Sequence, residues 1–291
     1  MSNQIPQQFN EIALHLAEGH ASVMVGAGFS RNAQYVANAK VKFLSWEELG
    51  ILFYKRLHGK QPDQNQFFDP MKIAGDLEAV IGRPGLEQLM RQSIPDLQII
   101  PSKLHENLMT LPWNDVFTTN YDTLLERAAE NVISQHYDIV VNQEDLVFST
   151  RPRIIKLHGS FPSHRPFIIT EEDYRRYPID FAPFVNTVQQ SLIENTLCLI
   201  GFSGRDPNFL KWIGWIRDNF GNNTPLIYMI VYEEDFSPDV QRLFLKRNIV
   251  PVNLTPLAGN PIFYEKAFNN FFDYLENKIN KEDPFSWPNC D

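Results

Sequence analysis

The sequence is poor in cysteine and in positive charge, and each shortage excludes a class of protein. Its 291 residues include two cysteines, Cys198 and Cys290, too few for a four-thiolate zinc site and unlike a disulfide-bonded scaffold. Lysine and arginine number 26 against 35 aspartates and glutamates, so the formal net charge is 26 − 35 = −9. Nonspecific nucleic-acid binding depends on clustered cations, so we expect no direct nucleic-acid partner. The cysteine usage predicts a reducing, cytoplasmic location.

Long apolar runs are also missing. The longest candidates, such as residues 196–202, have the length of a strand rather than of a membrane span. The N-terminus lacks the basic start and apolar core of a secretory signal. Because 43% of the residues are hydrophobic and 21% are charged, the composition is that of a globular protein with a sizeable core. We therefore expect a soluble protein that needs neither a membrane nor a metal.

Short apolar runs alternate with helical patterns along most of the chain, which is typical of a parallel sheet with helices on its faces. The apolar runs predict strands at residues 22–25, 115–118, 138–141, 153–157, 197–200, 226–231 and 249–253. Apolar residues spaced by three and four predict helices at 9–19, 46–57, 103–111, 122–133, 181–195, 207–220, 239–247 and 264–279. The predicted fold class is therefore α/β, with strands that are buried on both faces.

Two regions interrupt this alternation. Residues 34–111 contain no confident strand but several short helix candidates, so we predict a helical insertion or subdomain beside the sheet. Four prolines separate these candidates: Pro62, Pro70, Pro84 and Pro95. Residues 160–177 contain Pro162 and Pro166, which predict a loop-rich segment. The last residues, 281–291, carry two prolines and no helix cap, so they are either a natural terminus or a domain boundary.

Four predicted strands end in turns rich in glycine or polar residues, and the first is SVMVGAGFS. Gly26 and Gly28 allow close approach of a ligand, and backbone amides at such a turn can hold a diphosphate. Arg31 replaces the third glycine of the dinucleotide fingerprint. A tight turn without a ligand therefore explains this segment about equally well.

The second and third turns carry an amide, a carboxyl and an imidazole. In DVFTTNYD, Asn120 can orient a ribose hydroxyl or a water, although Asn120 and Asp122 are more commonly helix caps. In RIIKLHGS, His158 follows an apolar strand and can act as a general base, although a lone histidine is more often structural.

The fourth turn, in TLCLIGFSGRDPNF, contains Gly201 and Ser203 before Asp206 and Pro207. Aspartate followed by proline is a strong helix start, so we interpret these last two residues as structural. All four turns follow strands, and open parallel sheets bind ligands at the carboxyl ends of their strands. We therefore expect one pocket in which Asn120 and His158 face each other beside the glycine turn.

The motifs GAGFS, TTNYD, KLHGS and GFSGRD together resemble the ordered NAD-contacting motifs of the sirtuin family, over residues 22–206. The resemblance implies a single sirtuin-like domain over residues 1–291, with a Rossmann-like, mainly parallel sheet, helices on both faces and a smaller helical module. It implies NAD+ as substrate, with Asn120 and His158 as catalytic residues. The NAD-binding residues that it implies are Gly26, Ala27, Gly28 and Ser30 at the diphosphate, Thr119 and Asp122 near the nicotinamide ribose and carboxamide, and Gly201 and Ser203 at the adenosine side.

The chain departs from the sirtuin deacylases at three places. No zinc-binding cysteines follow KLHGS, so no zinc ribbon is expected. RNAQYVANAK stands where the deacylases continue with GIPDFR, and ITEEDYRRY occupies the stretch of the strand that clamps an acyl-lysine peptide. The pattern is more similar to the sirtuin-like NAD+ hydrolase domains of bacterial anti-phage defence proteins.

The resemblance leaves three functions to compare. The first is an NAD+ glycohydrolase that releases nicotinamide and ADP-ribose as the toxic effector of an anti-phage system. The second is a module that binds NAD+ or ADP-ribose without turnover, and the third is a zinc-free, NAD-dependent protein deacylase. By family analogy we also expect a homo-oligomer and either a C-terminal sensor domain or a phage-derived activator.

Overall fold

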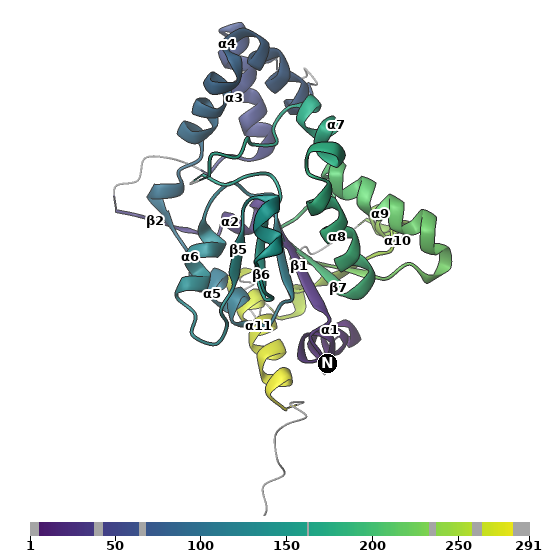
Figure 1. Ribbon diagram of the computed structural model, residues 1–291. Helices are drawn as coiled ribbons and strands as arrows, with labels where there is room; N and C mark the ends of the chain where they lie inside the picture. The colour runs from purple at the N-terminus through teal and green to yellow at the C-terminus, as the bar shows by residue number, and fades with distance from the viewer. Residues whose placement is uncertain are drawn as a thin grey trace, which may run out of the picture.

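A computed structural model describes residues 6–37, 43–63, 68–161, 163–232, 237–257 and 264–281. Its centre is a seven-stranded sheet in the order β5-β6-β4-β1-β7-β8-β9, and every neighbouring pair is parallel (Figure 1). The strands are β1 (Ala21–Val25), β4 (Asp115–Thr118), β5 (Asp138–Val140), β6 (Arg153–Lys156), β7 (Thr196–Ile200), β8 (Ile227–Val231) and β9 (Ile249–Asn253). All seven predicted strands are confirmed, with ends that differ by one residue at most.

Burial on both faces explains why these strands read as continuous apolar runs. All five residues of β1 are buried. Val23 and Val25 contribute to the core on one face of the sheet, whereas Met24 contributes to the core on the other. From β1 the chain first builds one side of the sheet, where β4, β6 and β5 lie in that spatial order, and later builds the other side with β7, β8 and β9. This reversal beside β1 creates the crevice in which open α/β sheets bind ligands.

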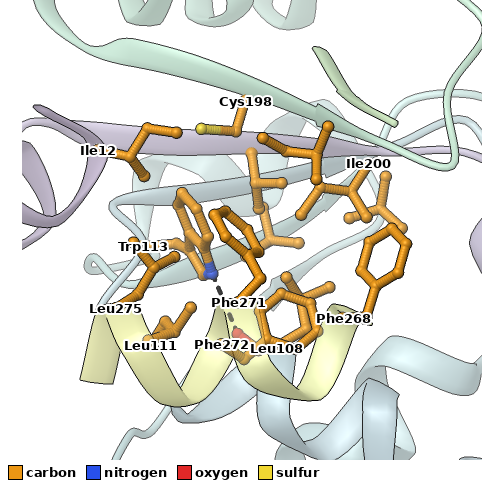
Figure 2. Packing of buried hydrophobic residues seen from close by; sticks show 14 of the residues in the cluster. Ile12, Leu108, Leu111, Trp113, Cys198, Ile200, Phe268, Phe271, Phe272 and Leu275 are labelled. Atoms are coloured by element: carbon orange, nitrogen blue, oxygen red, sulfur yellow. Dashed lines mark hydrogen bonds between the residues drawn. The ribbon is translucent and has the colours of Figure 1, made fainter. Parts of the chain in front are cut away.

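One face of the sheet is covered by α1 (Gln7–Ala17), α5 (Lys103–Thr110), α6 (Leu124–Glu130) and α11 (Tyr264–Lys281). Figure 2 shows Phe268, Phe271, Phe272 and Leu275 of α11 packed beneath the strands. Trp113 lies beside them, and its indole N–H donates to the carbonyl of Leu108 at 3.0 Å (Figure 2). The indole thus contributes a large apolar surface without leaving its N–H unsatisfied.

The opposite face is covered by α7 (Glu171–Asp180), α8 (Ala182–Glu194), α9 (Pro207–Phe220) and α10 (Pro238–Leu245). Helices on both faces of a mainly parallel sheet make the fold Rossmann-like, as predicted. The remaining short turns are α2 (Ala27–Ser30) and the 3-10 turns η1 (Asp96–Gln98), η2 (Gln143–Val147), η3 (Gly221–Asn223) and η4 (Thr255–Leu257). No helix in the described ranges is long and apolar enough to cross a membrane.

The helical module consists of α3 (Trp46–His58) and α4 (Pro70–Ser93), which lie together at the top of Figure 1. It has its own apolar core, to which Phe167 and Tyr121 of the main domain also contribute. Helix α4 breaks at Gly82, where φ is 72°, so Pro84 lies near the start of its second half. Within residues 34–111 the structure also has a short antiparallel pair, β2 (Gln34–Tyr35) and β3 (Ile99–Ile100), and α5 packs beneath the sheet instead.

Helix α7 corrects the prediction of a loop-rich segment at 160–177. Thr170 and Asp173 form a capping box that starts this helix, with Thr170 Oγ1 accepting from the Asp173 amide at 3.2 Å and the Asp173 carboxylate accepting from the Thr170 amide at 2.9 Å. Pro178 cannot donate to the carbonyl of Tyr174, which accepts from Lys211 Nζ at 3.4 Å instead. The proline therefore does not end the helix. Pro162, Cys290 and the predicted tail from residue 282 onward lie outside the described residues.

Candidate functional site

A cavity of about 470 Å³ opens at the carboxyl ends of β1, β4, β6 and β7. Helix α3 and the residues just before it form the opposite wall, with Leu44, Ser45, Trp46, Glu47 and Leu49. Nine of the ten residues predicted for the site line the cavity: Gly26, Ala27, Gly28, Thr119, Asn120, Asp122, His158, Gly201 and Ser203. The four turns therefore meet in one pocket, and Asn120 and His158 share it.

The glycines let two turns cross in van der Waals contact. A Cβ on Gly26 would lie 2.5 Å from the Gly201 oxygen, and a Cβ on Gly201, where φ is 59°, would lie 2.2 Å from the Phe29 nitrogen. The Gly28 amide donates to the Gly201 carbonyl at 3.0 Å, and the Gly26 amide donates to Ile200 at 3.0 Å. These two amides are thus engaged within the protein, and the close approach that the glycines permit is first of all that of the β1 and β7 turns.

Ser30 lies behind the pocket wall and connects two of the predicted site residues. Asn120 Nδ2 donates to Ser30 Oγ at 2.9 Å, and Ser30 Oγ donates to Asp122 Oδ2 at 3.0 Å. The Asn120 backbone amide donates to Thr118 Oγ1 at 3.1 Å. Ser30 is 3% exposed and does not line the cavity. These bonds fix the Asn120 amide with its nitrogen toward Ser30.

Asp122 lies near a buried ion pair between Lys156 Nζ and Glu126 Oε1, which are 2.9 Å apart. Lys156 Nζ also donates to the Asp122 carbonyl. Burial raises the pKa values of Asp122 and Glu126, and the charge of Lys156 opposes both shifts. Helix α6 begins at Leu124 rather than at residue 122, and its N-cap is Thr123, so neither Asn120 nor Asp122 is the helix cap that the sequence allowed. The Asp122 carboxylate, one residue before the cap, accepts from the Leu124 amide at 3.2 Å.

His158 is 2% exposed, and its Nε2 has no hydrogen-bond partner in the part of the chain that the structure describes. The ring packs edge-on against Tyr174 and Tyr177, with centroids 5.3 and 5.8 Å away. Burial lowers the pKa of His158 to about 4, against the opposing effect of Asp206. The imidazole is therefore neutral near pH 7 and can accept a proton.

The polar residues that line the cavity but were not predicted for the site include Tyr174 and Asp206. Asp206 caps α9 as predicted, since its Oδ1 accepts from the Phe209 amide at 3.0 Å. Its Oδ2 accepts from the Tyr174 hydroxyl at 3.0 Å and lies 3.9 Å from His158 Nε2. An aspartate followed by a proline predicts the helix cap, but it does not predict that the second carboxylate oxygen lies near His158.

An open parallel sheet with helices on both faces and polar turns gathered at its switch point defines a Rossmann-like domain. Residues 114–252 match the family model described as "SIR2-like domain". This part of the chain, which carries the TTNYD, KLHGS and GFSGRD motifs, is therefore similar to SIR2-like domains, and the resemblance to the sirtuin family is confirmed.

Several curated proteins are similar over much more of the chain. "NAD(+) hydrolase ThsA" of Acinetobacter baumannii is 29% identical over 277 residues, which cover 92% of this chain and 54% of that protein. The protein of the same name in Bacillus cereus is 25% identical, covering 81% of this chain and 48% of its own length. "Defense-associated sirtuin 2" of Bacillus subtilis is 22% identical, covering 75% of this chain and 21% of its own. The chain spans about half the length of the first two relatives.

Proposed function

We propose that this chain is the catalytic domain of an NAD+ glycohydrolase, which releases nicotinamide and ADP-ribose and depletes NAD+ in a bacterial defence against phage. The observation that carries the proposal is the meeting of Asn120 and a neutral His158 in one pocket beside the glycine turn. The names of the A. baumannii and B. cereus relatives support the same activity.

In the proposed reaction, the bond between ribose C1′ and the nicotinamide nitrogen breaks, and its electron pair leaves with nicotinamide. The ribose develops oxocarbenium character, and the oxygen of water adds to C1′ while a water proton passes to His158 and then to solvent. Asn120, held by Ser30, positions the nicotinamide ribose and the water. Positioning and proton transfer are sufficient because the departing nicotinamide needs no covalent nucleophile.

The remaining lining residues are proposed to bind the rest of NAD+. Gly26, Ala27 and Gly28 are assigned to the diphosphate, and Gly201 and Ser203 to the adenosine side. Thr119 and Asp122 are assigned to the nicotinamide end beside Asn120. Arg31 and Arg205 also line the cavity and can supply positive charge to the diphosphate.

The test is chromatography of NAD+ incubated with the protein, beside Asn120→Ala and His158→Ala. We expect each variant to release nicotinamide about a hundredfold to ten-thousandfold more slowly, as removal of a general base or of a positioning group does. Circular dichroism and thermal melting would show that each variant keeps its fold. Undiminished NAD+ loss in either variant would reject its assigned role.

Two other functions make different predictions. A binding module would hold NAD+ or ADP-ribose tightly in calorimetry without forming product. A deacylase would consume NAD+ only with an acylated peptide present. The stretch that would form the peptide-clamping strand contains helix α7 (Glu171–Asp180), which favours hydrolysis over deacylation.

Assembly and control are part of the proposal. A cytoplasmic homo-oligomer, with a C-terminal sensor domain or a phage-derived activator, would keep such an enzyme inactive until infection. The matched relatives extend well beyond the aligned region, so activity is best measured in the full-length protein and at several concentrations.

A further inference from the structure

Two polar atoms face each other inside the pocket without touching. His158 Nε2 is buried without a hydrogen-bond partner in the described residues, and Asp206 Oδ2 lies 3.9 Å away. This separation is too long for a direct hydrogen bond. An oxygen about 2.8 Å from each atom would hydrogen-bond to both, since this is the usual length of a bond to a hydroxyl and twice this length exceeds the separation.

We propose that Asp206 is a further catalytic residue, whose Oδ2 and His158 Nε2 together bind one O–H group of the reaction. The inference rests on the proposed NAD+ hydrolysis. The Tyr174 hydroxyl donates to the same Asp206 oxygen at 3.0 Å and holds the carboxylate toward the pocket. Asp206 therefore has a role in the reaction as well as in capping α9.

The O–H group has two possible sources with the same chemistry. A water would donate one proton to His158 Nε2 and the other to Asp206 Oδ2, leaving a lone pair for C1′. As the new C1′–O bond forms, the proton moves to Nε2 and the carboxylate stabilises the imidazolium. A ribose hydroxyl of NAD+ would instead share its single proton between the two acceptors and pass it to Nε2 while the C1′–N electron pair leaves with nicotinamide. The proton returns to the ribose oxygen when water adds to C1′ and gives up one of its own protons to solvent.

The charged groups around His158 determine what removal of the carboxylate does. Asp206 in the β7–α9 turn and Asp173 on α7 raise the pKa of His158, whereas Arg165 lowers it. Tyr174 and Tyr177 flank the ring, and their own pKa values are raised by burial, so both are neutral. Loss of the Asp206 charge should therefore lower the pKa of His158 further.

Asp206→Asn is the informative variant because asparagine is as good an N-cap as aspartate. The new side chain can still accept from the Phe209 amide while the negative charge beside His158 is lost. Helix α4 offers a matched control. Asp69 precedes Pro70 there, caps the helix by accepting from Met71 at 2.9 Å, and is not among the residues that line the pocket.

The experiment compares wild type, Asp206→Asn and Asp69→Asn by the pH dependence of kcat for nicotinamide release. We expect Asp206→Asn to lower kcat about tenfold to a hundredfold, as loss of a hydrogen bond to a charged group does. Its acid limb should also shift to lower pH, whereas Asp69→Asn should match wild type. Wild-type kcat and an unshifted limb in Asp206→Asn would overturn the inference, as would equal losses in both variants. A wild-type protein that releases no nicotinamide under any condition would instead reject the proposed function.

The source of the O–H group is found by repeating the comparison with NAD+ analogues that lack the 2′- or 3′-hydroxyl of the nicotinamide ribose. If the ratio of wild-type to Asp206→Asn rates collapses toward one with a single analogue, that hydroxyl is the bound group. If the ratio persists with both analogues, the bound group is water.

Discussion

His105 and His158 are the same side chain at nearly the same burial, yet they lie in regions with different chemistry. Both rings are at most 2% exposed, and neither Nε2 has a hydrogen-bond partner within the described ranges. Burial lowers the pKa of each to about 4. A buried, neutral histidine is therefore not by itself a sign of catalysis.

The groups that surround the two histidines are different. His105 packs against Phe29 at 4.9 Å, and its Nδ1 accepts from the Ser102 amide at 3.2 Å in a capping box of α5. The nearby charge is that of Arg127, which lowers the pKa further. His158 instead lines a cavity and faces Asp206 at 3.9 Å. An open cavity and a facing carboxylate distinguish the candidate base from the structural histidine.

The largest difference between the two histidines is expected when each is replaced by glutamine. Glutamine cannot act as a base, so His158→Gln should slow nicotinamide release about a hundredfold to ten-thousandfold. His105→Gln should stay within a few-fold of wild type because glutamine at this position also completes a capping box. Steady-state nicotinamide release measures both variants. Similar losses in the two would mean that His158 has no special role.

The next largest effect is expected in the pH dependence of stability, because a buried neutral histidine lowers the free energy of unfolding as pH falls. The folded-state pKa of His105 is about 4 against an ordinary 6.5. The unfolded chain therefore binds the additional proton between these values, and stability is lost as pH drops through this window. For a shift of this size the loss is about 3 kcal/mol.

His105→Gln should remove this part of the pH dependence. Urea unfolding of wild type and variant at pH 7 and near pH 4 measures the difference. An identical pH dependence in the two proteins would show that His105 is not buried neutral in the folded state.

The smallest effect is expected at Tyr174. Tyr174→Phe removes the hydroxyl that donates to Asp206 Oδ2 and leaves the ring against His158. A typical hydrogen bond contributes about 1 kcal/mol, so kcat should fall about fivefold with little change in KM. An equal kcat in wild type and Tyr174→Phe would show that the Tyr174 hydroxyl does not position the Asp206 carboxylate.

The fold was largely readable from the sequence because burial on both faces makes parallel strands continuous apolar runs. Helix α7 was missed because Pro162 and Pro166 predicted a loop through residue 177, whereas the helix begins after both prolines at a capping box formed by Thr170 and Asp173. The four pocket turns were predictable because the carboxyl ends of parallel strands meet at one edge.

Other parts of the site depend on contacts between distant segments, which local patterns do not contain. Ser30 was assigned to the diphosphate, yet it lies behind the wall and bonds Asp122, 92 positions later in the chain. The pairing of Tyr174 with Asp206 arises where α7 crosses the β7–α9 turn. The cavity wall formed by α3 belongs to the helical module. No sequence motif predicts how this module packs against the sheet.

The most direct test is a time course of NAD+ with the full-length protein and its His158→Gln and His105→Gln variants, resolved by chromatography. We expect wild type and His105→Gln to form nicotinamide and ADP-ribose in equal amounts, and His158→Gln to form almost none. Equal product from all three proteins, or intact NAD+ with wild type in its activated assembly, would contradict the assignment of this pocket to NAD+ hydrolysis.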